Sequence, residues 1–197
     1  AHNITPLIRV GDNNELIIKK AMDSGAHGVV VPMINTKEDA EKAVSAVKYP
    51  PMGKRGVGLF RAQNYGIGFN DYKKWLDKNS IVIAQIEHID GVNNITDIMN
   101  TEGIDAFIVG PYDLSASMGH PGNFEHPDVK SALNNLLEFM NKSDKPGGFH
   151  VVHSSTQDLK EKIEKGYKFL AYGDDMVFIS EKFSQEQHNF KQLLNKK

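Results

Sequence analysis

Six short apolar runs alternate with segments of helical periodicity along this chain, and this alternation constrains its fold more than any other feature. The runs are apolar almost throughout, which is typical of strands that are covered on both faces in a parallel sheet. The expected strands are Pro6–Val10, Gly28–Met33, Ile81–Glu87, Ala106–Gly110, Gly147–Val152 and Phe169–Gly173. The order strand then helix, repeated along the chain, predicts a wound α/β fold.

Helical patterns fill the intervals between these strands. Thr36 is a candidate N-cap for a helix over Lys37–Val47, and Asp39 stands at the spacing of a capping box. The other expected helices are Asn14–Ser24, Asn94–Asn100, His126–Asn141, Thr156–Lys165 and Ile179–Leu194. The segment Lys48–Asn79 is rich in Gly and Pro, and we interpret it as an ordered excursion over the active face with some helix near Asp71–Asp77.

Short helix-to-strand turns that contain Gly25, Gly103 and Gly166 favour a barrel. Six strand–helix units are two fewer than a (β/α)8 barrel needs, so an open six-stranded doubly wound sheet is a structural alternative. No G-x-G-x-x-G motif follows the first strand, which argues against a dinucleotide-binding fold. We expect residues 1–197 to form a single domain, because no linker or low-complexity segment interrupts them.

Composition excludes several classes of function. The chain has no cysteine, which excludes disulfides, thiolate catalysis and Cys-ligated metal sites. Its net charge of -2 gives no reason to expect nucleic acid or an anionic membrane as a partner. The apolar runs are too short for a membrane span, and the segment Ala1–Pro6 has no apolar signal region, so we expect a cytoplasmic protein.

Two expected strands end abruptly at a carboxylate. Glu87 closes the run that begins at Ile81, and Asp113 follows the run that ends at Gly110. The carboxyl ends of parallel strands form the face that carries the active site in barrels. Two carboxylates there suit a hard cation such as Mg²⁺ or Mn²⁺, although each acid could instead cap a helix or pair with a lysine.

The two acids belong to longer phrases, Gln85-Ile86-Glu87 and Gly110-Pro111-Tyr112-Asp113-Leu114-Ser115. With further phrases along the chain, they resemble the HpcH/HpaI aldolase/citrate lyase family, the relatives of 2,4-dihydroxyhept-2-ene-1,7-dioate aldolase and 2-dehydro-3-deoxyglucarate aldolase. The Gln-x-Glu phrase at 85–87 and the Gly-Pro-x-Asp-Leu-Ser phrase at 110–115 are the most specific part of the resemblance. The other matching phrases are Pro6-Leu7-Ile8-Arg9-Val10, Val31-Pro32-Met33, Tyr49-Pro50-Pro51 with Arg55-Gly56-Val57-Gly58, and Gly119.

The resemblance implies a (β/α)8 TIM barrel of the phosphoenolpyruvate/pyruvate type. It also implies a homo-oligomer, a trimer or hexamer, in which neighbours exchange a terminal helix. The family begins with two further βα units, the second of which delivers a histidine thought to act in proton transfer. This sequence starts at what would be the third strand, so we expect those two units to be missing from the chain.

The resemblance assigns roles to residues at the strand ends. Glu87 and Asp113 are the expected ligands of Mg²⁺, Mn²⁺ or Co²⁺, and Arg9 is expected to bind substrate and stabilise a developing enolate. Gln85 points the same way as Glu87 and is expected to bind substrate or orient a ligand. The turn formed by Gly110, Pro111 and Tyr112, with Asp113, is expected to bind the carboxylate of pyruvate through the N–H groups of Tyr112 and Asp113.

Several other side chains have weaker claims. Asp23 matches an acid that partners the proton-transfer histidine in relatives, and we list it with Arg9 as a catalytic candidate. Arg55 is expected to cover the site, and Ser115 is expected to cap a helix rather than to catalyse. His88, His150 and His153 are possible metal ligands by residue type, but we predict no histidine ligand.

The expected activity is that of a class II, metal-dependent aldolase that cleaves a 2-oxo-4-hydroxy acid reversibly into pyruvate and an aldehyde. No lysine stands at a strand end, which disfavours a Schiff-base mechanism. The alternatives are another metal–enolate C–C lyase of the citrate-lyase or malyl type, and a catalytically inert, truncated family member.

Overall fold

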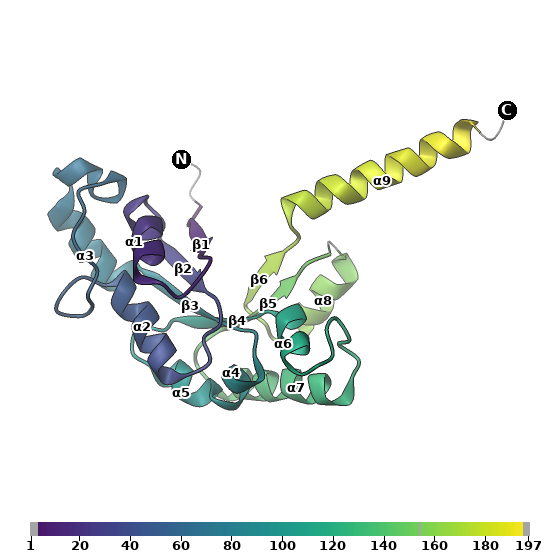
Figure 1. Ribbon diagram of the computed structural model, residues 1–197, viewed down its shortest axis with the longest axis horizontal. Coiled ribbons are helices and arrows are strands. Elements are labelled where there is room, and N and C mark those ends of the chain that lie inside the picture. Colours follow the sequence, from purple (N-terminus) through teal and green to yellow (C-terminus); the bar gives the residue numbers. More distant parts are fainter. Residues whose placement is uncertain (1–3, 154, 195–197) are drawn as a thin grey trace. The chain divides into compact units, whose positions relative to one another are not determined.

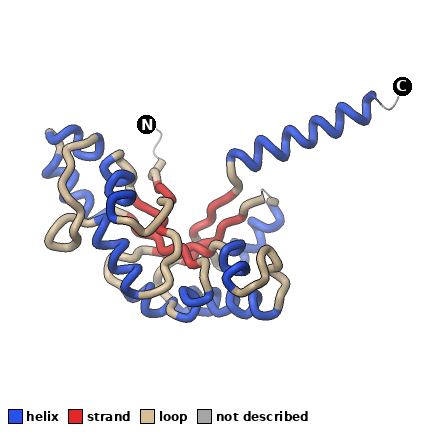
Figure 2. The backbone as a smooth tube through the Cα atoms, viewed as in Figure 1, coloured by secondary structure: helices blue, strands red, loops and turns tan. Residues whose placement is uncertain are grey.

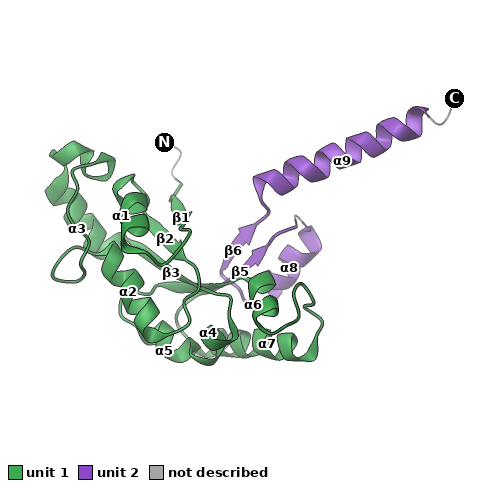
Figure 3. Ribbon diagram, viewed as in Figure 1, with its two compact units in different colours: residues 1–147 green, residues 148–197 purple. Residues whose placement is uncertain are grey.

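A computed structural model describes residues 4–153 and 155–194 of the chain. Backbone contacts divide it into two compact units, residues 1–147 and residues 148–197 (Figure 3), which are treated separately below. The predicted single domain over 1–197 stays a prediction. Ala1, His2 and Asn3, part of the N-terminal segment in which we expect no signal region, lie outside the described residues.

Strands and helices alternate along both units, as Figure 2 shows in red and blue. Unit 1 contains β1 (Leu7–Arg9), α1 (Glu15–Asp23), β2 (Gly28–Val31), α2 (Lys37–Val47), the 3₁₀ helix η1 (Arg61–Gly66), α3 (Phe69–Asn79), β3 (Ile81–Ile86), α4 (Ile89–Asn93), α5 (Ile95–Asn100), β4 (Ala106–Val109), α6 (Pro111–Ser117) and α7 (Pro127–Lys142). Unit 2 contains β5, which runs over Gly147–Val151 from the end of unit 1, then α8 (Thr156–Glu164), β6 (Phe169–Tyr172) and α9 (Asp175–Leu194). The six expected strands are confirmed.

Strands β1 to β4 of unit 1 pair in parallel and in chain order (Figure 1). One face of this sheet is sealed by helices, since α1 packs beside α2 and against β2, and α2 packs against β3. Side chains that point to this face are completely buried; they include Val29, Val82, Ile86 and Phe107. A parallel α/β fold is therefore confirmed for unit 1. Because helices cover the apolar side chains on this face of the sheet, polar functional residues are expected at the ends of the strands.

Local capping explains where the helices begin and end. Thr36 and Asp39 form the predicted capping box at the start of α2, with a 3.1 Å bond from the Asp39 N–H to the Thr36 hydroxyl. Asn14 caps α1 through its side-chain oxygen, which accepts from Leu16 and Ile17. Gly25 follows α1 with a φ of +103°, a left-handed conformation that favours glycine.

Three sequence expectations for helices need correction. Gly110, Pro111 and Tyr112, which we expected to form a turn, instead start helix α6: Gly110 is its N-cap, and Pro111 begins the helix because its fixed φ suits a first helical position. Ser115 is therefore inside a helix rather than at its cap, where its hydroxyl donates to the Tyr112 carbonyl. Helix α9 also begins four residues before the expected Ile179, because Asp174 accepts from the N–H groups of Met176 and Val177.

In unit 2, β5 and β6 pair in parallel, with His150 beside Ala171. Phe149 packs against the ring of Tyr167, with 5.4 Å between the ring centroids. Helix α9 is exposed along its length, and its exposed apolar side chains include Met176, Ile179, Phe183 and Phe190. Within the described residues, no helix combines the length and apolar character that a membrane span requires.

Candidate active site at the strand ends

Neighbouring strands deliver the candidate residues to one edge of the sheet in unit 1. Glu87 directly follows β3 and Gly110 directly follows β4, and the pairing of Ile86 with Val109 makes them neighbours. Asp113 lies in the first turn of α6. Met33 follows the end of β2, which pairs with β3 on its other side. The structure therefore brings Glu87, Gly110 and Asp113 to the carboxyl ends of adjacent strands, where the sequence predicted them.

The Glu87 carboxylate is buried and held by two donors. The backbone N–H of Met33 donates to Glu87 Oε1 over 2.9 Å, and the amide of Gln85 donates to Glu87 Oε2 over 2.5 Å. Only 5% of Glu87 is exposed to solvent. Gln85 thus holds the Glu87 carboxylate, and both roles expected for Gln85, binding substrate or orienting a ligand, stay predictions. Each carboxylate oxygen keeps a lone pair for a further partner.

Burial raises the pKa of the Glu87 carboxyl above its ordinary value. The negative charge of Asp113 raises this pKa further, while the Met33 N–H, the Gln85 amide and the positive charge of Arg9 lower it. A buried acid beside a second carboxylate is stabilised by any cation placed between them.

Gly110 allows the chain to pass directly over this carboxylate. A Cβ atom at position 110 would lie 2.9 Å from Glu87 Oε2 and 3.1 Å from Gln85 Nε2. Any larger residue would therefore fill the space next to the Glu87 oxygen. Tyr112 is 45% exposed and packs edge-on against Phe124, with 5.0 Å between the ring centroids.

Arg9 lies on the same face of the sheet as Glu87. Arg9 pairs with Val30, which pairs with Ile83, and residues 83, 85 and 87 alternate onto one side of β3. The Arg9 side chain is exposed, and its Nη1 donates to the Val10 carbonyl over 3.1 Å. Its guanidinium is therefore available to an anionic ligand.

The donor set fits a hard divalent cation. Glu87 and Asp113 would supply oxygen ligands, and Gly110 leaves open the space beside Glu87 Oε2 that a Cβ would fill. Oxygen donors of this kind suit Mg²⁺ and Mn²⁺ better than metals that prefer imidazole or thiolate.

Asp23 is not brought together with these residues. It ends α1 beside the amino end of β2, because His27 accepts from Ile81 and donates to Pro6 at the amino ends of the neighbouring strands. Asp23 Oδ2 accepts from Lys19 over 2.6 Å. The catalytic role expected for Asp23 stays a prediction, and the structure shows it in a buried polar network at the other end of the strands.

The same network contains Arg55, which the sequence analysis expected over the active site. Arg55 is completely buried between Tyr49 and Tyr72, with its guanidinium carbon 4.3 Å from the Tyr49 ring centroid. Its Nε lies 4.0 Å from Asp23 Oδ1, and Gln63 bridges Asp23 and the Tyr49 hydroxyl. Arg55 therefore anchors the segment 48–68 to the end of α1.

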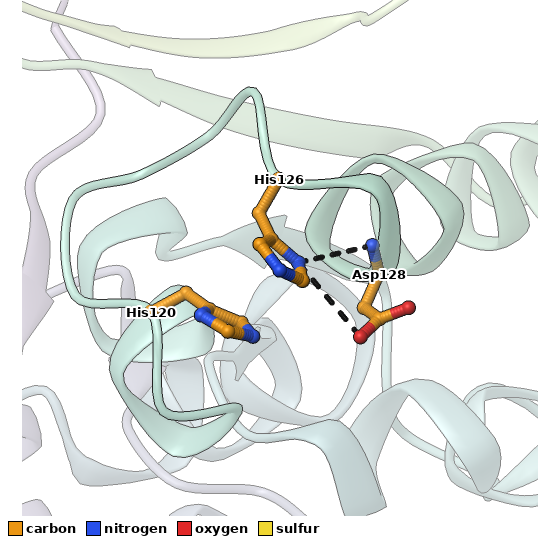
Figure 4. Close-up of side chains that lie close together, drawn as sticks. All are labelled: His120, His126 and Asp128. Atoms are coloured by element: carbon orange, nitrogen blue, oxygen red, sulfur yellow. Dashed lines mark hydrogen bonds and ion pairs between the residues drawn. The ribbon is translucent and has the colours of Figure 1, made fainter.

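One group of potential ligands was missed by sequence reasoning. His120, His126 and Asp128 place one ligand atom each within 4.8 Å of one another, and Figure 4 shows the three side chains lying close together. The sequence signal that could have revealed it is two histidines and an aspartate in the nine-residue segment 120–128, which also contains glycine and proline. The histidines that stood out in the sequence were His88, His150 and His153 instead.

Comparison with known proteins identifies the family. A model of the HpcH/HpaI aldolase/citrate lyase family matches residues 1–181. The chain belongs to this family. Its members are aldolases and lyases, so the prediction of an enzyme of the carbon–carbon lyase class is confirmed.

Individual family members extend the match. The 5-keto-4-deoxy-D-glucarate aldolase of Escherichia coli O139:H28 (strain E24377A / ETEC) is 39% identical over 176 residues, which are 89% of this chain and 68% of the relative. The crystal structure of an HpcH/HpaI aldolase/citrate lyase family protein from Burkholderia cenocepacia J2315 superposes with a TM-score of 0.87 at 31% identity, covering 95% of this chain and 74% of that one. The crystal structure of the citrate synthase SbnG gives a TM-score of 0.83 at 28% identity, covering 98% and 74%.

Proposed function

We propose that this HpcH/HpaI family member is a class II aldolase that cleaves a 2-oxo-4-hydroxy acid reversibly into pyruvate and an aldehyde, with Mg²⁺, Mn²⁺ or Co²⁺ as its cofactor. The observation that carries the proposal is the buried Glu87 carboxylate, fixed by the Met33 N–H and facing the charges of Asp113 and Arg9. This arrangement provides oxygen ligands for a cation and a guanidinium for an anionic substrate at one strand edge.

The name of the E. coli relative supports the substrate class. A glucarate has a carboxyl group at each end, so a keto group at carbon 5 lies next to the carboxyl at carbon 6. The deoxy carbon 4 is then a methylene, followed by a hydroxyl-bearing carbon 3. Counted from that end, the relative's substrate is a 2-oxo-4-hydroxy acid.

In a 2-oxo-4-hydroxy acid, numbered from the carboxyl next to the keto group, the reaction breaks the bond between the methylene carbon 3 and the hydroxyl-bearing carbon 4. The hydroxyl on carbon 4 loses its proton and becomes the aldehyde carbonyl, while the bonding pair remains on carbon 3 as the enolate of pyruvate. Protonation of carbon 3 then yields pyruvate. A divalent cation, when bound, supplies Lewis-acid stabilisation of the negative charge that develops in this step.

The residues of this chain bind and orient the reacting groups. Glu87 and Asp113 hold the cation, and Gln85 fixes the Glu87 carboxylate through its 2.5 Å hydrogen bond. The backbone at Gly110, Pro111 and Tyr112 contacts the substrate carboxylate, with the N–H groups of Tyr112 and Asp113 as donors. Arg9 places positive charge beside the oxygen that becomes the enolate.

The resemblance assigns the proton transfer to a histidine of a βα unit that precedes the matched strands in relatives. The proposal accordingly includes an eight-stranded barrel to which this chain contributes six strand–helix units. It also includes a cytoplasmic location and a homo-oligomer, a trimer or hexamer. The exposed apolar residues of α9 support the oligomer, because a neighbouring subunit would cover them.

A citrate-type reaction is the second candidate. The citrate synthase SbnG superposes closely on this chain, and its name describes formation of a carbon–carbon bond. Such an enzyme would use the same oxygen ligands and enolate-stabilising arginine, but its enolate would come from an acetyl group and its electrophile would be a 2-oxo acid. An inert protein that binds metal without turnover is the third outcome that an assay must distinguish.

The test is exchange of the pyruvate methyl protons in D₂O, followed by NMR. This exchange reports enolate formation without requiring the correct aldehyde. We expect exchange that stops with a chelator and returns with Mg²⁺ or Mn²⁺, together with pyruvate release from 5-keto-4-deoxy-glucarate. Citrate formation without pyruvate exchange or aldol cleavage would favour the second candidate, and metal binding without exchange, cleavage or citrate formation would refute catalysis by the chain.

A further inference from the structure

The cluster of His120, His126 and Asp128 lies outside the candidate active site. His120 is in the loop after α6, His126 is the N-cap of α7, and Asp128 lies in the first turn of α7. The imidazole rings are 3.4 Å apart between centroids and nearly parallel, at 19° (Figure 4). Within the part of the chain that the structure describes, this is the only group in which three such ligand atoms lie within 4.8 Å of one another.

Hydrogen bonds that do not involve the imidazoles hold the loop in place. The His120 N–H donates to the Ser115 carbonyl over 2.8 Å, and the Gly122 N–H donates to the Ser115 hydroxyl over 2.9 Å. The Asn123 N–H donates in turn to the His120 carbonyl over 2.9 Å. Because Ser115 is completely buried, the loop is anchored to the core and the two rings meet without a ligand between them.

Helix capping accounts for only part of this cluster. His126 Nδ1 accepts from the Asp128 N–H over 3.3 Å and lies 3.8 Å from the Asp128 carboxylate. His88 caps α4 in the same way, since its Nδ1 accepts from the Asp90 N–H over 3.2 Å. The cap at α4 has no second imidazole stacked on it within the described residues. The position of His120 therefore needs another explanation.

We propose that His120, His126 and Asp128 bind a divalent metal that prefers imidazole, Zn²⁺ being the first choice. Two imidazole nitrogens and one carboxylate oxygen are a common protein donor set for zinc, with water as a fourth ligand. Capping uses Nδ1 of His126, so Nε2 is its free ring nitrogen for a metal. Coordination requires the partly exposed rings to turn out of their stack, which rotation about side-chain bonds permits.

This metal site differs from the strand-end site in chemistry and in consequence. The strand-end site offers oxygen ligands and suits Mg²⁺, whereas the cluster offers nitrogen. The loop that carries the cluster packs on Tyr112 through Phe124, with 5.0 Å between ring centroids. A metal at the cluster therefore stabilises the loop that packs on Tyr112, the residue before Asp113 in the chain, and its binding does not depend on the proposed aldolase reaction.

The test is calorimetric titration of the untagged full chain with Zn²⁺ in excess Mg²⁺, which keeps the oxygen site occupied. We expect one Zn²⁺ per chain and about a 10-fold or greater loss of affinity in His120→Ala and in His126→Asn. Asparagine keeps the N-cap of α7, and His88→Asn is the matched control at α4, expected to bind Zn²⁺ like the wild type.

Wild-type affinity in both cluster variants, or an equal loss in His88→Asn, would overturn the proposal. Variants that fail to fold are replaced by a measurement on the wild type. There, Zn²⁺ should shift the NMR signals of the His120 and His126 rings before those of any other histidine. Shifts confined to other histidines would equally refute the site, whatever the outcome of the aldolase assay.

Discussion

Met33 donates its backbone N–H to Oε1 of Glu87 over 2.9 Å, from a residue whose φ is +53°. A left-handed conformation is unfavourable for a residue with a side chain, and such residues concentrate at functional sites. The turn after β2 thus accepts local strain in order to fix the carboxylate that ends β3. This relationship is the basis for assigning Glu87 as the principal ligand of the proposed cation.

Replacing Glu87 with Gln should abolish metal-dependent binding of pyruvate. Glutamine is nearly isosteric but lacks the negative charge that a divalent cation requires. Calorimetry with Mg²⁺ and pyruvate measures the effect, with the exposed Glu102→Gln as the control. Unchanged affinity in Glu87→Gln, with a normal circular dichroism spectrum, would remove Glu87 from the metal site.

Replacing Gly110 with Ala should weaken metal-dependent pyruvate binding by about 10-fold and lower the free energy of unfolding by about 1–3 kcal/mol. The added Cβ would lie 2.9 Å from Glu87 Oε2 and 3.0 Å from Glu87 Cβ, so the carboxylate must move. Gly56→Ala is the control, because no atom lies within 4 Å of a Cβ at position 56. Equal behaviour of the two variants would show that this close approach has no importance for binding.

Replacing Arg9 with Ala should lower kcat by about 100-fold while leaving metal affinity nearly unchanged. Arg9 is exposed and lies on the face that carries Glu87, so its loss removes charge stabilisation rather than a ligand. Arg9→Lys should recover only part of the rate, since lysine lacks the planar fork. The exposed Arg61→Ala serves as control, and a wild-type kcat in Arg9→Ala would exclude Arg9 from the mechanism.

Replacing Asp23 with Asn should destabilise the fold by about 3 kcal/mol. The change removes the counter-charge from the buried Arg55, whose Nε lies 4.0 Å from Asp23 Oδ1, and from Lys19. Asp77→Asn, which breaks the more exposed pair with Lys73, should cost less than about 1 kcal/mol. Urea unfolding of both variants measures the difference, and equal stability losses would contradict a buried electrostatic role for Asp23.

Replacing Tyr167 with Phe should flatten the alkaline pH dependence of stability. Burial raises the pKa of Tyr167 from 10.0 to about 12 in the folded protein. The folded state therefore resists ionisation, and this contribution, full below pH 10, is lost as pH rises through about 12. The loss is about 3 kcal/mol at most. Between about pH 10 and pH 12, the free energy of unfolding should fall less steeply with pH in Tyr167→Phe than in the wild type. Identical slopes in the two proteins would contradict the burial effect.

The sequence by itself determined the features that depend on neighbouring residues. The strand runs are confirmed, and the Thr36–Asp39 capping box lies where its spacing placed it. Glu87 and Asp113 could be predicted at the strand ends for the same reason, since an apolar run that stops at an acid is a local pattern. Periodicity and capping act over a few residues, so they can be read without knowing the fold.

Tertiary structure alone decided which distant groups meet. The bond from Met33 to Glu87 joins residues 54 positions apart, and Asp23 meets Gln63 and Arg55 at the opposite end of the strands from Glu87. The stacking of His120 on His126 depends on a loop anchored by the buried Ser115. These contacts follow from how packed strands and helices position their connecting segments, and no local pattern in the sequence encodes that packing.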